Sequence, residues 1–380
     1  LQRARIFDSE GRIFARERQA PSLYAYPSFL KGPHDAAQRL AIRLGLDEDD
    51  LVDRITRRAD SGRMMQEVPI KRTLTQRELE SVGNLNGWGE GGFRIKYEPA
   101  RYYPEDQLAA HVLGFVDRDQ KGLEGIEASY DSYLRAVPGK QKSRVDGKRS
   151  MLGPLTLQYV APEGGGDVYL TIDKPIQHIL ERELANAMES RQASSAMGLV
   201  LDPKTGAVLA LASLPAYDPN APSEYPTQSR VNAAISFVFE PGSAFKIVPF
   251  TAAIELGLCA PGTKVDCENG AWNAFGLRRI RDVHKMGTVT VAEMFAHSSN
   301  IGTIKIAHDI VLAHGPAELD AWIRRFGFGE KTGRDLRHES AGFYHPDGKW
   351  TKFSEISLPM GQEIAVTMPQ LARAFAAIAN

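Results

Sequence analysis

The sequence predicts an α+β protein with two domains: an elongated N-terminal module, then a domain whose helices surround a mainly antiparallel sheet. A chain of 380 residues is longer than most single domains. The run Gly164-Gly165-Gly166 has the composition of a linker. Beyond it, strand, helix and hairpin patterns follow one another in a regular order, as in layered folds of mixed class. We therefore expect domains over residues 1–164 and 165–380.

Composition excludes several classes of function. The formal net charge is -1 and hydrophobic residues make up 43% of the chain, so there is no electrostatic case for nucleic acid binding or for a polybasic membrane contact. No apolar run approaches the roughly 18 residues of a membrane span, and no signal peptide opens the chain. Because the chain starts at Leu1 and stops at Asn380 within a helical pattern, both ends look cut, and a membrane anchor before Leu1 is compatible with the sequence.

The chain has two cysteines, Cys259 and Cys267, in a loop that contains Pro261-Gly262. Such scarcity suits a reducing compartment or a periplasmic enzyme that does not depend on disulfides. We favour two free thiols over a bridge. Two cysteines without a suitably spaced histidine pair do not make a structural zinc site, so we predict neither a metal nor a cofactor.

The first domain is a series of short elements without an obvious pocket, which favours a spacer or interaction module. The patterns predict a hairpin over residues 5–15, a charged helical stretch over 35–58, a helix after the capping-box pair Thr75 and Glu78, a short helix leading into a strand over 108–116, and a helix over 130–134.

The second domain begins with a clearer succession of elements. We expect a strand over 168–172, a helix from Lys174 or Pro175 to about Met188, and a hairpin that joins 197–201 to 207–212 through a turn. Together these elements predict helices packed on an antiparallel sheet.

The segment around Ser243 predicts a nucleophile at the start of a helix. Pro241-Gly242 forms a turn, and apolar residues then recur at helical spacing until Gly257. Residues three apart on a helix share a face, so the hydroxyl of Ser243 lies beside the amine of Lys246. A lysine partly removed from water loses its preference for the charged form and can activate a serine.

Ser-x-x-Lys is a weak pattern by itself, and the chain contains a second copy at Ser28-Phe29-Leu30-Lys31. That copy lies between Pro27 and Gly32-Pro33, which leaves no room for a helix to align the two groups. We interpret it as a loop.

A second group of candidates is His297-Ser298-Ser299-Asn300. Thr290 with Glu293 forms a capping box for a helix over 291–297, and the turn that follows leads into a helix from Gly302 to about Val311. A hydroxyl at Ser298 and an amide at Asn300 can both face a cleft from such a turn. Alone, Ser-x-Asn would be an ordinary helix cap; together with Ser243 and Lys246 it indicates a catalytic site.

The order Ser-x-x-Lys then Ser-x-Asn is that of penicillin-binding proteins and serine β-lactamases. Further segments agree, and they extend over nearly the whole chain: Arg101-Tyr102-Tyr103-Pro104, Ala109-Ala110-His111-Val112-Leu113-Gly114, Gly125-Ile126-Glu127 with Tyr130-Asp131, Thr171-Ile172-Asp173, Asp202-Pro203-Lys204-Thr205-Gly206, Glu240-Pro241-Gly242-Ser243, Asp282-Val283-His284, Phe326-Gly327-Phe328-Gly329, and Val366-Thr367 with Gln370-Leu371-Ala372. Together they resemble a class B penicillin-binding protein, a monofunctional peptidoglycan transpeptidase. The Asp-x-His segment and Ser-Ser-Asn resemble the septal branch of that family.

The resemblance implies a pedestal-type N-terminal domain, a penicillin-binding transpeptidase domain and a serine acyl-transfer mechanism. Ser243 would attack the carbonyl between the two terminal D-alanines of a stem peptide, with neutral Lys246 as base. Ser298 would carry the proton to the departing D-alanine, and Asn300 would bind the donor amide. An amine from a second stem peptide would then resolve the acyl-enzyme, and β-lactams would acylate the same serine.

The resemblance also implies partners and a location. We expect peptidoglycan stem peptides ending in D-Ala-D-Ala as substrate, β-lactam antibiotics as inhibitors, and division-complex membrane proteins as partners of the N-terminal domain. The expected location is the periplasmic, or extracytoplasmic, face of the cytoplasmic membrane, with an anchoring helix outside this sequence.

One departure concerns Lys-Thr-Gly, the family's third motif. It occurs at Lys204-Thr205-Gly206, in the tip of the predicted hairpin, and at Lys331-Thr332-Gly333, in a predicted turn. The family places this motif on an edge strand that pairs with the substrate peptide, so we interpret both copies as decoys and expect the functional one beyond Asn380. Three alternatives follow: a non-catalytic interaction fragment, a β-lactamase and a D,D-carboxypeptidase.

Overall fold

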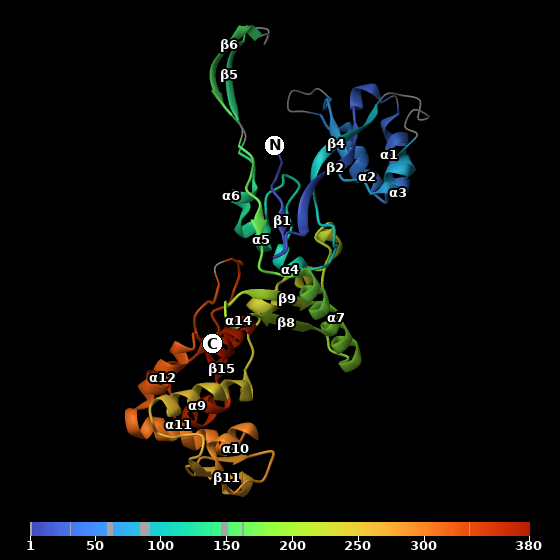
Figure 1. Cartoon of the computed structure of the whole chain (residues 1–380). Helices are drawn as coiled ribbons and strands as arrows, with labels where there is room; N and C mark the ends of the chain where they lie inside the picture. The colour runs from blue at the N-terminus through green and yellow to red at the C-terminus, as the bar shows by residue number, and fades with distance from the viewer. Residues whose placement is uncertain are drawn as a thin grey trace. The chain divides into compact units, whose positions relative to one another are not determined.

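The computed structural model describes residues 2–30, 32–58, 64–83, 92–137, 139–145, 151–161, 163–333 and 335–380 (Figure 1). The chain divides into two compact units. Unit 1 comprises Leu1–Ile6, Ala15–Pro104 and Tyr133–Val168, and unit 2 comprises Phe7–Phe14, Glu105–Ser132 and Tyr169–Asn380. The sequence-based division between residues 164 and 165 stays a prediction.

Unit 1 contains most residues of a five-stranded sheet with the strand order β3-β2-β1-β7, in which β4 also pairs with β2. The strands are β1 (Ile6–Phe7), β2 (Ile13–Ala25), β3 (Val68–Lys71), β4 (Phe93–Tyr102) and β7 (Val168–Tyr169). Helices α1 (Pro33–Leu44), α2 (Glu48–Thr56) and α3 (Gln76–Val82) share an apolar core with this sheet, in which Leu23, Leu40 and Leu51 are fully buried. Strands β5 (Lys140–Val145) and β6 (Met151–Val160) form a separate antiparallel ribbon (Figure 1).

The helical stretch predicted over residues 35–58 is two helices, not one. Gly45 has the left-handed φ of 61° at the end of α1, which a glycine adopts at little cost and which ends the helix. Asp47 then starts α2, because its side chain accepts a hydrogen bond of 2.8 Å from the N–H of Asp50. The predicted capping box of Thr75 and Glu78 is confirmed at the start of α3.

After Pro104 the chain forms the short helices α4 (Ala110–Leu113), α5 (Gly125–Ser129) and α6 (Asp131–Leu134). The helix predicted within 108–116 is confirmed, but the strand after it is wrong, since only an isolated bridge joins Val116 to Gly122. Helix α7 (Lys174–Arg191) packs on the antiparallel hairpin of β8 (Ala196–Leu201) and β9 (Val208–Leu214). The side-chain amide of Gln177 closes this contact, because it exchanges two hydrogen bonds of 2.9 Å with the backbone of Leu211.

The rest of unit 2 is mainly helical, with three small antiparallel strand pairs in its described residues (Figure 1). Its helices are α8 (Ala233–Ser236), α9 (Ile247–Glu255), α10 (Val291–Ala296), α11 (Asn300–His314), α12 (Pro316–Arg325), α13 (Ser354–Ser357) and α14 (Met368–Ala379). Its strand pairs are β10 (Lys264–Asp266) with β13 (Thr288–Thr290), β11 (Ala271–Ala274) with β12 (Arg278–Arg281), and β14 (Phe343–Tyr344) with β15 (Ile364–Ala365).

Helices α9, α11 and α12 pack together around a buried apolar core that includes Phe250, Ile306 and Leu319. This core fixes α9 beside α11, so the residues at the start of each helix can form one site. The predicted class, α+β with helices around antiparallel strands, is confirmed.

Candidate active site

Ser243 lies in a 3-10 helix, η5 (Gly242–Lys246), which continues directly into α9. The predicted helix start is confirmed, and its first turn is tighter than an α-helix. In a 3-10 helix residues three apart are eclipsed, so Ser243 and Lys246 share a face. The side chain of Ser243 is exposed, and its hydroxyl forms no hydrogen bond to any residue that the structure describes.

Lys246 is buried, with 2% of its surface exposed. Its amine lies 2.6 Å from the carbonyl oxygen of Ser298, 3.1 Å from the hydroxyl of Ser298, and 2.7 Å from Oδ1 of Asn300. Within the described parts of the chain, no carboxylate forms an ion pair with it. Burial lowers the pKa of Lys246 to about 8, against the opposing effect of the negative charge on Asp282.

The three oxygens suit both protonation states of Lys246. A charged amine has three N–H donors and can donate to all three oxygens. A neutral amine has two donors and a lone pair, so it can donate to the Ser298 carbonyl and the Asn300 amide oxygen and keep its lone pair for an incoming proton. A proton can therefore enter or leave this amine without any change in side-chain position.

Ser298 has a left-handed backbone, with a φ of 56°. This conformation costs an L-residue about 1–2 kcal/mol. Ser298 lies between the predicted and confirmed capping-box helix α10 and helix α11, whose N-cap is Ser299. The left-handed turn directs both oxygens of Ser298 toward Lys246. Helix α11 is longer than predicted because it starts at Asn300 and ends at His314.

Asp282 binds the residues that follow Ser298 in this turn. Its Oδ1 accepts hydrogen bonds from the N–H of Asn300 at 2.6 Å and of Ile301 at 3.2 Å, and its Oδ2 accepts one from the Ser299 hydroxyl at 2.5 Å. The sequence identified Asp282 only as part of a resembling segment and assigned it no role. That segment was the one signal that could have found it.

The turn that supports Ser243 is in close contact with another segment. The N–H of Gly242 donates to the carbonyl of Gly361 at 3.1 Å. Gly361 has a φ of 76°, and a Cβ at this position would lie 2.1 Å from the carbonyl oxygen of Gly242. The serine turn therefore requires a glycine at position 361.

The structure brings Lys246, Ser298 and Asn300 together and places Ser243 one turn before Lys246.

The first Lys-Thr-Gly copy lies in the turn between β8 and β9, where the Thr205 hydroxyl donates to Asp202. The second copy lies in an irregular segment that Glu339 holds through hydrogen bonds from Thr332 and Gly333.

The remaining candidates are accounted for as follows. Ser28 lies in a short 3-10 turn, η1 (Pro27–Phe29), and Lys31 lies outside the described residues. Cys259 and Cys267 are both free thiols. Within the described residues, no group of three or more histidine, cysteine, aspartate or glutamate side chains could hold a metal ion. No helix among them is long and apolar enough to cross a membrane.

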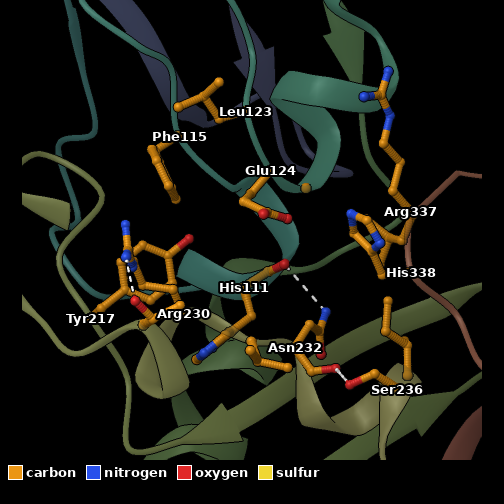
Figure 2. Close-up of a pocket in the computed structure, with 15 residues that line it drawn as sticks. His111, Phe115, Leu123, Glu124, Tyr217, Arg230, Asn232, Ser236, Arg337 and His338 are labelled. Carbon is orange, nitrogen blue, oxygen red and sulfur yellow. Dashed lines mark hydrogen bonds between the residues drawn. The ribbon is translucent and has the colours of Figure 1, made fainter. Parts of the chain in front are cut away.

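A cavity of about 600 Å³ opens elsewhere in unit 2, and it contains none of the four candidate residues (Figure 2). Its walls include Phe115, Tyr217 and Arg230, and Figure 2 shows Glu124 directed into it. His111 is buried in its wall, where its ring bonds to the Ser229 carbonyl at 2.8 Å and where burial lowers its pKa. A cavity alone does not identify an active site.

Two family models match the chain. The penicillin-binding protein dimerisation domain matches residues 2–170, and the penicillin-binding protein transpeptidase domain matches residues 196–380.

Three curated relatives align with this chain over its full length. It is 30% identical over 381 residues to the probable peptidoglycan D,D-transpeptidase PenA of Neisseria meningitidis, and covers 63% of that protein. It is 30% identical over 390 residues to the peptidoglycan D,D-transpeptidase FtsI of Escherichia coli, covering 62% of it, and 29% identical to the stage V sporulation protein D of Bacillus subtilis, covering 57%. All of this chain aligns with each of the three, and it spans less than two thirds of their lengths.

One solved structure, of a peptidoglycan synthetase from Bifidobacterium adolescentis, superposes with a TM-score of 0.73 at 25% identity. The superposition covers 100% of this chain and 71% of that one. Two consecutive family models, relatives that align with the whole of this chain, and this superposition agree: the chain belongs to the class B penicillin-binding proteins.

Proposed function

We propose that this protein is a serine-type peptidoglycan D,D-transpeptidase that cross-links stem peptides through an acyl-enzyme on Ser243. One observation carries the proposal: a buried lysine amine with its pKa lowered to about 8 lies one turn after an exposed serine and is held by Ser298 and Asn300. A neutral amine in this position is a general base.

In the first step the Ser243 oxygen attacks the carbonyl of the penultimate D-alanine, and Lys246 takes the hydroxyl proton. The carbonyl becomes a tetrahedral oxyanion. The N–H of Ser243, in the first turn of its helix, has no acceptor within that turn and is suited to donate to this oxyanion.

In the second step the peptide bond breaks, and the terminal D-alanine leaves as an amine. The Ser298 hydroxyl, 3.1 Å from the Lys246 amine, passes the proton from Lys246 to the departing nitrogen. Asn300 binds the donor peptide with its amide nitrogen, whose contact with the Arg281 carbonyl is long at 3.4 Å, while its amide oxygen stays on Lys246. Ser243 is left as an ester of the donor peptide.

In the third step an amine of a second stem peptide attacks this ester, a new amide bond forms, and Ser243 recovers its proton. A β-lactam would acylate Ser243 by the first step. Its leaving amine would stay attached through the opened ring, so the product would persist.

We further propose a role in septal wall synthesis at the outer face of the cytoplasmic membrane, with division-complex proteins bound through the N-terminal domain. The resemblance of Asp282-Val283-His284 and Ser298-Ser299-Asn300 to the septal branch supports this.

The test is covalent labelling of the complete gene product by a fluorescent penicillin. The wild type should give a stable adduct, and Ser243→Ala should give none. Ser28→Ala is the matched control, because it alters the exposed serine of the other Ser-x-x-Lys copy, and it should label fully. Labelling of Ser243→Ala would overturn the proposal. Rapid release of hydrolysed penicillin would instead identify a β-lactamase. If the stem peptide is hydrolysed and not transferred although an amine acceptor is present, the enzyme is a carboxypeptidase.

A further inference from the structure

The start of helix α11 is held by a carboxylate from outside the helix. Asp282 follows β12, and its two oxygens accept three hydrogen bonds from Ser299, Asn300 and Ile301. The first N–H groups of a helix have no acceptor within it and favour a negative charge. No basic side chain among the described residues forms an ion pair with Asp282. Its carboxylate is therefore committed to this turn.

Ser299 links Asp282 to the helix. Ser299 is buried, and a serine hydroxyl has one proton. Its short 2.5 Å bond to Asp282 directs that proton to the carboxylate, which leaves an oxygen lone pair to accept from the N–H of Gly302 at 3.0 Å. Asp282 thus orients the N-cap of α11 as well as binding its first N–H groups.

Ser298 is clamped on both sides. Its own N–H donates to the Phe295 carbonyl at 3.0 Å, at the end of α10, and the next residue is the N-cap that Asp282 holds. A left-handed residue that is not glycine persists only where its surroundings hold it. If Ser299 and Asn300 were released, Ser298 could relax, and its two oxygens would leave Lys246.

We propose that Asp282 is a positioning residue for the acyl-transfer reaction: by fixing Ser299 and Asn300, it keeps both oxygens of Ser298 on Lys246. This inference rests on the proposed function. Asp282 acts through the turn and through its charge, since no hydrogen bond or ion pair joins it to Lys246.

Strand β12, which precedes Asp282, is held in place by contacts that do not involve the Asp282 carboxylate. Ile280 is buried in a cluster with Ile301 and Ile304 of α11, and the Arg278 guanidinium donates to the Ser357 hydroxyl at 3.2 Å. A substitution at Asp282 would therefore leave β12 in place and disturb mainly the turn.

The charge of Asp282 provides a second readout. Its field raises the pKa of Lys246 against the effect of burial, so removal of the charge should lower that pKa further. Three other titratable groups lie beside this turn. The Cys267 thiol is 3.5 Å from the Ser299 hydroxyl, and burial raises its pKa. His284 and His297 are exposed, with ring centroids 5.6 Å apart. A merely structural residue would change the amount of folded protein but not the pH at which the remaining protein reacts.

The experiment uses the complete gene product and measures the rate constant for acylation by a fluorescent penicillin between about pH 5.5 and 9.5. Saturating label counts the competent molecules. For Asp282→Ala we expect a rate about 10- to 100-fold below wild type at full labelling stoichiometry, which is the order of effect of small misplacements in an active site. The midpoint of its pH profile should move to lower pH.

Asp282→Asn keeps the shape and can still accept from Asn300 and Ile301, so it should fold even if the alanine variant does not. We expect an intermediate loss of rate with a similarly lowered midpoint. Asp266→Asn is the matched control, because among the described residues the Asp266 carboxylate accepts a hydrogen bond only from the N–H of Glu268, at 2.9 Å, and from no residue of the turn. This control should react as wild type does.

Wild-type rate and midpoint in Asp282→Ala would overturn the inference. So would a loss confined to labelling stoichiometry with an unchanged midpoint, because that result describes a structural residue. Failure of the proposed function is distinct, because the wild type itself would then form no adduct at Ser243.

Discussion

Two lysines near helix α11 illustrate how surroundings decide what an amine can do. Lys305 lies on α11 and donates to the Glu268 carboxylate at 2.7 Å and to the Asp266 carbonyl at 2.8 Å, with a quarter of its side chain exposed. Lys246 is buried among neutral oxygens and has no ion-pair partner in the described chain. An amine that faces a carboxylate serves as one half of an ion pair. A buried amine without that partner loses its proton more readily.

The largest effect on acylation is expected when the neutral amine of Lys246 is removed. Lys246→Arg keeps the positive charge but cannot lose its proton, so it should slow acylation of Ser243 by a factor of about 10² to 10⁴, the usual contribution of a general base. Stopped-flow labelling with a fluorescent penicillin measures this rate. An arginine variant within threefold of wild type would show that Lys246 is not the base.

The pH dependence should follow the pKa of Lys246, about 8. The reactive form is the neutral amine. Below the pKa its fraction falls about tenfold for each pH unit, and above the pKa it is nearly complete. The acylation rate should therefore rise about tenfold from pH 6 to pH 7 and level off above about pH 8. A rate that is flat from pH 6 to 8 would contradict the assignment.

The serine side of the site can be tested through Gly361. Alanine there would place a Cβ 2.1 Å from the Gly242 carbonyl at a left-handed φ of 76°, so the serine turn would have to shift. We expect destabilisation of about 1–3 kcal/mol, as for other overpacked sites, with a roughly tenfold slower acylation. Thermal unfolding and labelling rates check the two effects. Gly348→Ala is the control, because a Cβ there would meet no atom within contact distance.

The smallest effect is expected at Lys305. Lys305→Ala removes a partly exposed ion pair, which contributes at most about 1 kcal/mol to the stability of a protein. Its acylation rate should stay within about twofold of wild type, with the same pH midpoint. A large loss of rate would mean that Lys305 also contributes to acylation, although it faces a carboxylate.

The parts of the site that depend on local sequence could be predicted. The spacing of Ser243 and Lys246 placed both on one turn, and Thr290 with Glu293 located the helix before Ser298. At Ser28 the sequence predicts a loop, whereas the structure has the short 3-10 helix η1; its position relative to Lys31 stays a prediction, because Lys31 lies outside the described residues.

The parts that depend on distant contacts could not be predicted. No local pattern marks the left-handed backbone of Ser298, the bonds from Asp282 to α11, or the approach of Gly361 to the serine turn. Each depends on segments that meet only in the folded chain. The strand predicted within 108–116 is wrong for a related reason, because an apolar run forms a strand only when another strand pairs with it.

The most direct test of the central claim is the protonation of Lys246 itself. Lysine-selective ¹⁵N NMR of the wild type and of Lys246→Arg identifies the Lys246 amine by the signal that disappears, and its titration gives the pKa. We predict a midpoint of about 8. A midpoint at the ordinary lysine value of 10.5 would show that burial does not release this proton, and Lys246 could not then activate Ser243.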